Sequence, residues 1–340
     1  MIRVLIAESS PFRANFISRS LQDSGVGESV GVARNGEEAI LLTHRLKPDV
    51  IVMDAGLPVL RAALATRHIM EHCPSPILIT AAPDSNSETL AFLALDEGAV
   101  DLMARQSYAG QDPSAALSRR ISKRIELAAR SCLAAASNRR AGPATTRGSN
   151  GGSADLILMG GAVGGVQATT DILRRLPPSF AGSICLVQHL PPGFLEGYTR
   201  WLRTETGFRV EVCDRARPVT PRTIYLAPPE AHLVVEKQDS VAPQRGRAIG
   251  GHRPSITALF RSAAAVRPDA SCAVVLSGEG RDGVEGVKRM AKLGGAVVVQ
   301  RAETCLVSEM PHHALRAHPG SLELSPAEIA EKLASARSLT

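Results

Sequence analysis

Short apolar runs alternate with longer amphipathic stretches along most of this 340-residue chain. Such alternation is typical of parallel sheets covered by helices, because two parallel strands need a long crossover between them. Residues 1–112 contain five apolar runs at this spacing, namely 4–6, 30–32, 50–53, 77–79 and 100–103. The alternation resumes after residue 154 and ends in a predicted helix at Pro326–Ser335. The sequence therefore predicts two α/β domains, the second of them doubly wound.

A segment that cannot contribute to a core separates the two halves. Residues 138–153 hold no large apolar residue and much Gly, Ser and Thr, which is typical of a flexible linker. Before it, Pro113 could open a long helix, whose apolar side would carry Ala116, Ile121, Ile125, Ala128 and Cys132. The predicted boundaries are 1–112 for the first domain, 113–137 for its last helix and connector, 138–153 for the linker and 154–340 for the second domain.

The charge lies mostly between the domains. The formal net charge is +6, but residues 113–153 hold eight Arg or Lys and one Glu, so the rest of the chain is close to neutral. Neither domain then has the basic surface that a nucleic-acid partner requires. No apolar run reaches membrane-spanning length and no signal peptide opens the chain. The six cysteines show no metal-ligand spacing, and we expect a cytoplasmic protein without membrane insertion.

The second domain carries chemistry-bearing residues at the ends of its predicted strands. The glycine-rich segment Met159–Gly165 follows the apolar run 156–158. Glycines permit a tight strand-to-helix turn that lifts one side chain to the rim of the sheet, and that residue here is Ala162. His189 and Asp282 also follow apolar runs. Because strand ends in a parallel sheet share one edge, we expect these two residues to lie near Ala162.

Two carboxylates follow strands of the first domain in the same way. Glu8 lies after the first predicted strand and Asp54 after the third. Two carboxylates at one edge indicate cation or phosphoryl chemistry, since hard cations prefer carboxylate oxygens. The alternative is that both are solvated strand-end residues.

The second half of the chain resembles the CheB-type chemotaxis protein-glutamate methylesterases. The resemblance spans roughly residues 154–335 and rests on the segments Leu186–Phe194, His252–Ser255 and Leu276–Gly283. It implies a Ser-His-Asp triad in which His189 is the general base and Asp282 orients it. The serine position is Ala162. The resemblance further implies an oxyanion site and cleft at Gly161, Gly164, Glu279, His252 and Arg253.

The family hydrolyses glutamyl methyl esters and deamidates glutamine on chemoreceptors, without a cofactor in the esterase domain. Alanine has no hydroxyl with which to form an acyl-enzyme, so we expect this activity to be impaired in the chain as written. Glu279, where the family has methionine, would place a carboxylate near the developing oxyanion. The alternative is a catalytically inactive, receiver-regulated binding or adaptor protein in a chemosensory pathway. In both cases the implied partners are chemoreceptor cytoplasmic domains and a chemotaxis histidine kinase.

The first half resembles the flavodoxin-like receiver domains of two-component signalling. Residues 49–58 carry the resemblance, which implies that Asp54 accepts phosphate beside a Mg²⁺ ion held by Glu8 and Asp54. Ser9 takes the place of a second acid and Arg105 that of a lysine. Thr80 could supply the switch hydroxyl, although Ala81 occupies its expected place.

Other functions are less compatible with the sequence. The turn at Gly160, Ala162 and Gly165 resembles a loosened dinucleotide fingerprint, yet no acidic residue ends the next strand. No carboxylate or cysteine lies at ligand spacing from His252, His312 or His313. The second half also has no basic recognition helix for DNA.

Overall fold

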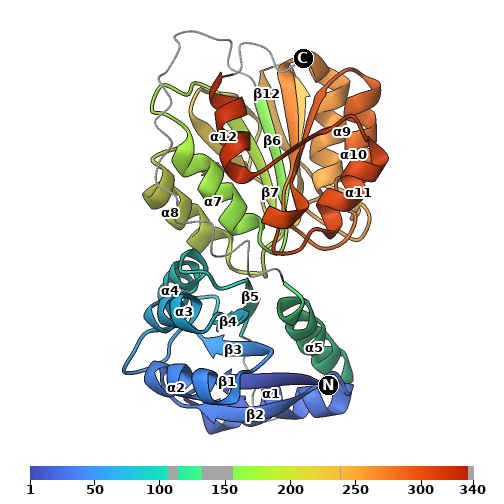
Figure 1. Ribbon diagram of the computed structural model, residues 1–340. Helices are drawn as coiled ribbons and strands as arrows, with labels where there is room; N and C mark the ends of the chain where they lie inside the picture. The colour runs from blue at the N-terminus through green and yellow to red at the C-terminus, as the bar shows by residue number, and fades with distance from the viewer. Residues whose placement is uncertain (106–113, 132–155, 238, 336–340) are drawn as a thin grey trace. The chain divides into compact units, whose positions relative to one another are not determined.

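The computed structural model describes residues 1–105, 114–131, 156–237 and 239–335. The chain forms two compact units, each built on its own parallel sheet (Figure 1). The predicted linker 138–153 lies outside the described residues. Within the described ranges, no helix has both the length and the apolar character that a membrane crossing requires.

The first unit has a five-stranded parallel sheet in the order β2-β1-β3-β4-β5, which is the flavodoxin-like order. Helix α1 packs on α5, and α3 packs on both α2 and α4. All five predicted strands are confirmed. The elements are β1 (Ile2–Ala7), α1 (Pro11–Ser24), β2 (Gly27–Ala33), α2 (Gly36–Leu46), β3 (Val50–Asp54), α3 (Ala62–His72), β4 (Ile77–Ala81), α4 (Ser85–Asp96), β5 (Asp101–Ala104) and α5 (Ala115–Ala129).

Helix α5 differs in detail from its prediction. It begins after Ser114, whose side chain accepts a hydrogen bond from the Leu117 amide. Ile121, Ile125 and Ala128 are buried as expected, but Ala116, in the first turn of the helix, is exposed. Pro113 and Cys132 lie outside the described residues.

The second unit contains a seven-stranded, wholly parallel sheet in the order β15-β14-β13-β6-β7-β10-β8. Helices α7, α8 and α12 lie on one side of it and α9, α10 and α11 on the other (Figure 1). The elements of this layer are β6 (Leu156–Gly161), α7 (Gly165–Arg175), β7 (Ser183–Gln188), α8 (Leu195–Thr206), β8 (Arg209–Val212), β10 (Thr223–Leu226), α9 (Ile256–Val266), β13 (Ser271–Val275), α10 (Val284–Lys292), β14 (Ala296–Gln300), α11 (Glu309–Ala317), β15 (Leu322–Leu324) and α12 (Pro326–Ser335).

A small antiparallel sheet was not predicted. Strands β9 (Arg217–Pro218), β11 (His232–Lys237) and β12 (Ser240–Gln244) pair in the order β11-β12-β9. The chain between β11 and β12 is too short for a parallel crossover, so their pairing has to be antiparallel. That spacing was available in the sequence and could have indicated this sheet.

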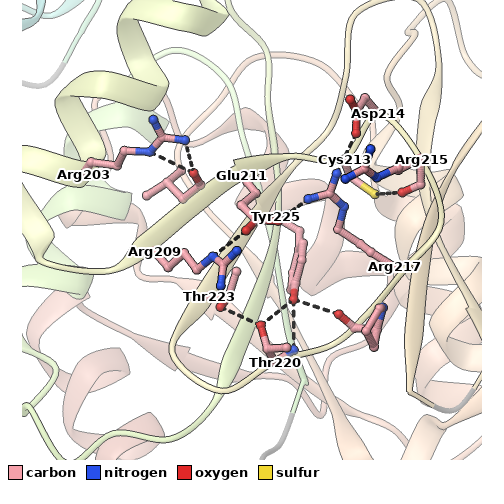
Figure 2. A network of polar contacts seen from close by, with 12 residues as sticks. Arg203, Arg209, Glu211, Cys213, Asp214, Arg215, Arg217, Thr220, Thr223 and Tyr225 are labelled. Atoms are coloured by element: carbon pink, nitrogen blue, oxygen red, sulfur yellow. Dashed lines mark hydrogen bonds and ion pairs between the residues drawn. The ribbon is translucent and has the colours of Figure 1, made fainter.

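A polar network fixes the edge strand β8 to its surroundings (Figure 2). Glu211 on β8 forms ion pairs with Arg209 and Arg217, and these hydrogen bonds hold the pKa of its carboxyl below the usual range despite burial. The Tyr225 hydroxyl accepts from the Thr220 amide at 2.9 Å and donates to the Pro218 carbonyl at 3.0 Å. Side chains therefore tie together this end of the sheet.

Strand β6 lies at the point where the chain changes direction across the larger sheet. Strands β7, β8 and β10 follow on one side of β6, and β13, β14 and β15 follow on the other. Ligands of open α/β sheets bind outside the carboxyl ends of the strands at such a point. The residues that follow β6, β7 and β13 are therefore where the fold predicts a ligand site.

Candidate functional site

The turn between β6 and α7 has the conformation that its glycines predict. Gly164 has a φ of 79° and caps α7. A Cβ at this position would lie 2.5 Å from Ser277 Oγ and 2.8 Å from Leu306 Cβ. A residue with a side chain would therefore meet both backbone strain and a steric clash. The turn brings Ala162, which is only 7% exposed, to the end of the strand.

Backbone hydrogen bonds hold three strand ends together around Ala162. The Ala162 amide donates to the Ser277 carbonyl at 3.0 Å, and the His189 amide donates to the Gly161 carbonyl at 2.9 Å. Gly278 packs so closely that a Cβ there would lie 2.9 Å from the Ala162 Cβ. The segments after β6, β7 and β13 therefore meet at one place, as the sequence predicts.

The Asp282 carboxylate accepts several hydrogen bonds at this place. It accepts from the His189 ring at 2.9 Å and from the Ser255 hydroxyl at 2.8 Å. It also accepts from the Ile256 and Thr257 amides, at 2.8 and 3.0 Å, which belong to the first turn of α9. Burial opposes ionisation, but the His189 hydrogen bond and charge and these amides outweigh it, and the pKa of Asp282 falls far below its usual value.

The bond to Asp282 determines which nitrogen of His189 can act as a base. An ionised carboxylate only accepts hydrogen bonds, so His189 Nε2 carries a proton in either charge state of the ring and donates it to Asp282 Oδ2. A base is needed only while the ring is neutral. Nδ1 is then the acceptor of the ring. The structure thus contains an oriented, hydrogen-bonded His-Asp pair.

His252 lies directly against this pair. Its ring stacks on that of His189 with a centroid separation of 4.5 Å and an interplanar angle of 21°. Burial, reinforced by His189, lowers the pKa of His252, while Asp282 and Glu279 act in the opposite direction. Glu279 is therefore close enough to influence the site electrostatically.

His189, His252 and Asp282 each offer an atom within 4.8 Å of the others, as a metal site would require. Imidazole lone pairs lie in the plane of the ring, and two nearly parallel stacked rings cannot direct theirs at one ion. Both Asp282 oxygens are already taken by several donors. The arrangement is that of a hydrogen-bonded pair with a stacked neighbour.

Arg253 extends away from the His-Asp pair. Its guanidinium forms an ion pair with Glu230 and donates to the Gly246 carbonyl at 3.1 Å. Of the two adjacent residues proposed for the cleft, the structure brings only His252 to the His-Asp pair.

A pocket of about 540 Å³ opens beside His252 and Asp282. Its lining is rich in cationic side chains, which come from α9, α10, α11 and the loop before α10, namely Arg261, Arg281, Lys288 and Arg316. Glu285 also lines it and pairs with Lys288 at 2.7 Å. The net charge of the lining is positive, which favours an acidic occupant.

Two neighbouring serines are engaged elsewhere. Ser277 is buried, and its hydroxyl lies 2.7 Å from the Val163 carbonyl, to which it donates. The Ser255 hydroxyl donates to Asp282 and caps α9. Among the described residues, neither hydroxyl is hydrogen-bonded to His189, so neither stands where an activated nucleophile would.

The first unit brings Glu8 and Asp54 together at the edge of its sheet. Both are buried, with 2% and 3% of their surfaces exposed, so they are not solvated strand-end residues. Arg13, in the first turn of α1, contacts Glu8 through two nitrogens at 2.6 and 2.8 Å and Asp54 at 3.3 Å. Arg105 Nη1 lies 3.0 Å from both oxygens of Asp54. Two carboxylates and two guanidinium groups form one cluster, which we call the receiver quartet.

Thr80 and Ser9, which were also predicted for this pocket, are neighbours of the receiver quartet. Thr80 is buried and pairs with Asp54 in the register of β3 and β4, while Ser9 lies in the loop after Glu8. Burial and the charge of Glu8 raise the pKa of Asp54, whereas Arg105, the Gly56 amide and Arg13 act against that rise. The Asp54 carboxylate therefore depends on its arginine partners for its charge.

Comparison with known proteins agrees with this geometry. Residues 157–333 match the CheB methylesterase family, and residues 4–110 match the response regulator receiver domain family. The chain belongs to the CheB methylesterase family. Both the family and the fold class expected from the sequence are confirmed.

The relatives match along almost the whole chain. Protein-glutamate methylesterase/protein-glutamine glutaminase 3 of Anaeromyxobacter dehalogenans (strain 2CP-C) is 35% identical over 343 residues, which is 98% of both chains. The similarly named protein 4 of Myxococcus xanthus (strain DK1622) is 30% identical over 98% of this chain and 97% of its own. The CheB methylesterase catalytic domain of Thermotoga maritima, a crystal structure, aligns at 29% identity with a TM-score of 0.51, covering 54% of this chain and 98% of that one.

Two features of these CheB-family sites were missed by the sequence analysis. The amides of Ile256 and Thr257 hold Asp282, and Ser255, within a motif already singled out, is an evident helix cap that could have indicated them. Arg13 gives no comparable signal, because its contact with Asp54 joins residues that only the fold brings together.

Proposed function

We propose that this protein is a CheB-family chemotaxis regulator that engages chemoreceptor segments without hydrolysing them. One observation carries the proposal. Ala162 occupies the turn where the triad needs a nucleophile, beside a His-Asp pair that is otherwise formed. Relatives in this family are named protein-glutamate methylesterases and protein-glutamine glutaminases, and both reactions proceed through an attack that alanine cannot make.

The remaining groups do not compensate for the missing hydroxyl. In serine hydrolases, loss of the nucleophile costs on the order of a millionfold in turnover. His189 can still accept a proton at Nδ1, but no serine supplies one from position 162. Glu279 lies near His252, and a carboxylate there opposes the negative charge that develops in ester hydrolysis. The same site therefore favours binding over turnover.

The cationic pocket supports an acidic partner. Arg261, Arg281, Lys288 and Arg316 line the pocket beside Asp282, and this positive lining would attract a segment that carries free glutamates next to the modified ones. We therefore propose that chemoreceptor cytoplasmic domains bind here. A chemotaxis histidine kinase would supply the input to the receiver domain at Asp54, and with these partners the protein would act in the cytoplasm.

The expected Mg²⁺ ion fits the receiver pocket poorly. Its proposed ligands are Glu8 and Asp54, with Ser9 where the resemblance calls for a further acid. Arg13 spans both carboxylates, and Arg105 contacts both oxygens of Asp54. The oxygens that Mg²⁺ would need are therefore already paired with cations.

Methanol release from methylated chemoreceptors tests the loss of hydrolysis. The chain as written should release methanol no faster than its His189→Ala variant, since both lack a working triad. Ala162→Ser should restore measurable release, and Glu279→Met in the same background should increase it. Turnover of the unmodified chain clearly above the His189→Ala control would refute the proposal.

Binding is measured separately on the same proteins. Receptor fragments should bind the unmodified chain and Ala162→Ser equally, because residue 162 contributes only a methyl group or a hydroxyl. Arg281→Ala combined with Arg316→Ala should weaken that binding and make it less sensitive to salt. Binding that is unchanged in this double variant would remove the pocket from the proposal.

A further inference from the structure

In the receiver quartet, the charges of the two carboxylates are balanced by those of the two arginines. Arg13 donates through Nε to Glu8 Oε2 at 2.8 Å and through Nη2 to Glu8 Oε1 at 2.6 Å, a two-point contact that matches carboxylate geometry. The same Nη2 lies 3.3 Å from Asp54 Oδ2, and Arg105 Nη1 lies 3.0 Å from each Asp54 oxygen. Two buried negative charges thus face two positive charges supplied by the chain itself.

Arg13 is held firmly in this position. It is in the first turn of α1, which begins with Pro11 and is capped by the Ser10 side chain. The Ser10 amide also donates to Glu8 Oε1 at 2.8 Å, so the loop before the helix orients the carboxylate toward Arg13. The Arg13 side chain is partly buried, with 29% of its surface exposed. Local backbone geometry therefore supports the contact between Arg13 and Glu8.

A divalent cation and Arg13 would need the same atoms. Mg²⁺ binds oxygens at about 2.0–2.1 Å in octahedral geometry and retains several waters. An ion that bridged Glu8 and Asp54 would compete for their oxygens with Arg13 Nη2, which contacts Glu8 Oε1 and Asp54 Oδ2. It would also have to lie beside two fixed positive charges. Binding of the ion therefore requires displacement of the guanidinium from a two-point ion pair.

We infer that Arg13, together with Arg105, takes the place of the divalent cation in this receiver domain. The pocket does not bind Mg²⁺ while Arg13 is present, and the receiver domain maintains its folded structure without a metal. This inference concerns the receiver domain alone, and its outcome is independent of whether the second domain hydrolyses esters.

Electron paramagnetic resonance of Mn²⁺, used as the probe for the divalent site, tests the inference on the full-length protein. The unmodified chain and its Asp54→Asn variant should give the same Mn²⁺ signal, because neither binds the ion in the receiver pocket. Arg13→Met combined with Ser9→Asp should gain a site at least tenfold tighter than any in the unmodified chain, and adding Asp54→Asn should abolish it. Mn²⁺ binding by the unmodified chain that Asp54→Asn abolishes would overturn the inference.

The single variants distinguish Arg13 from the missing acid. Ser9→Asp alone should remain without the site, because Arg13 still occupies it. If Ser9→Asp alone binds Mn²⁺ as tightly as the double variant, Arg13 does not exclude the ion and the inference fails. Arg19→Met, which removes an exposed arginine from the same helix, is the matched control and should behave as the unmodified chain.

Calorimetric unfolding of the same proteins gives a readout that does not depend on a bound probe. The receiver transition of the unmodified chain should be the same in EDTA and in millimolar Mg²⁺. The transition of the folded Arg13→Met, Ser9→Asp variant should move to higher temperature when Mg²⁺ is added, since ligands that bind only the folded state stabilise it. A folded Arg13→Met, Ser9→Asp variant that neither binds Mn²⁺ nor is stabilised by Mg²⁺ would also refute the inference.

Discussion

Replacement of Asp282 by alanine should destabilise the second domain by about 3–5 kcal/mol. The variant leaves the Ile256 and Thr257 amides without their acceptor, and each buried unsatisfied donor costs about 1–3 kcal/mol. His189 loses its partner as well. The Gly283 amide is less affected, because Thr257 Oγ1 also accepts from it at 2.9 Å. The Ser255 hydroxyl loses its acceptor too, so the loss comes mainly from two amides, one hydroxyl and one imidazole.

Urea unfolding followed by tryptophan fluorescence measures this loss selectively. The chain has one tryptophan, Trp201, which is buried in α8 of the second unit. With a slope of about 3 kcal/mol per molar urea, the midpoint should fall by about 1–2 M. Asp269→Ala, which removes an exposed carboxylate from the same unit, should change stability by less than about 0.5 kcal/mol. An Asp282→Ala midpoint that matches this control would show that the carboxylate is not the buried acceptor described here.

Three further outcomes are expected. The depressed pKa of Asp282 adds stability at pH values above the ordinary carboxyl pKa of about 3.9, and this stability is lost as the pH falls toward the lower folded-state pKa. The free energy of unfolding between pH 6 and about pH 3 should therefore depend on pH less steeply in Asp282→Asn. Gly164→Ala should destabilise the second domain by about 2–4 kcal/mol, from its φ of 79° and the contact with Ser277, and a change below about 0.5 kcal/mol in urea unfolding would contradict this. Phosphate labelling by a small phosphodonor should be weak and should vanish in Asp54→Asn, and labelling that survives this change would place the acceptor elsewhere.

The layered fold was predictable because burial on both faces of a parallel strand leaves a clear signal. Each predicted strand of the first domain is a short apolar run, and each appears in the sheet, as Ile51 and Leu78 illustrate with no exposed surface. Strands β9, β11 and β12 give a weaker signal, because they are partly exposed and one contains only two residues. The small antiparallel sheet was missed for that reason.

The site was predictable to the extent that strand ends define it. Ala162, His189 and Asp282 each follow an apolar run, and the rule that parallel strands end at one edge was enough to bring them together. The backbone donors to Asp282 are harder to predict, because every residue has an amide. The helix cap at Ser255 indicates the first turn of α9, but only the tertiary position of α9 brings its amides to Asp282. The contact of Arg13 with Asp54 likewise depends on tertiary structure.

Retention of the His-Asp pair is weak evidence for retained hydrolysis, because the structure gives Asp282 a second role. Its carboxylate joins the segment after β13 to the first turn of α9 through the Ile256 and Thr257 amides, and this role would persist in a protein that hydrolyses nothing. His189 in turn supplies a donor that helps to keep the buried carboxylate ionised. A role in folding therefore accounts for both residues in a chain that carries Ala162. The Ala162 side chain has no such hydrogen-bonding role, because it is a single methyl group, and so residue 162 is the position that discriminates an enzyme from a binding protein.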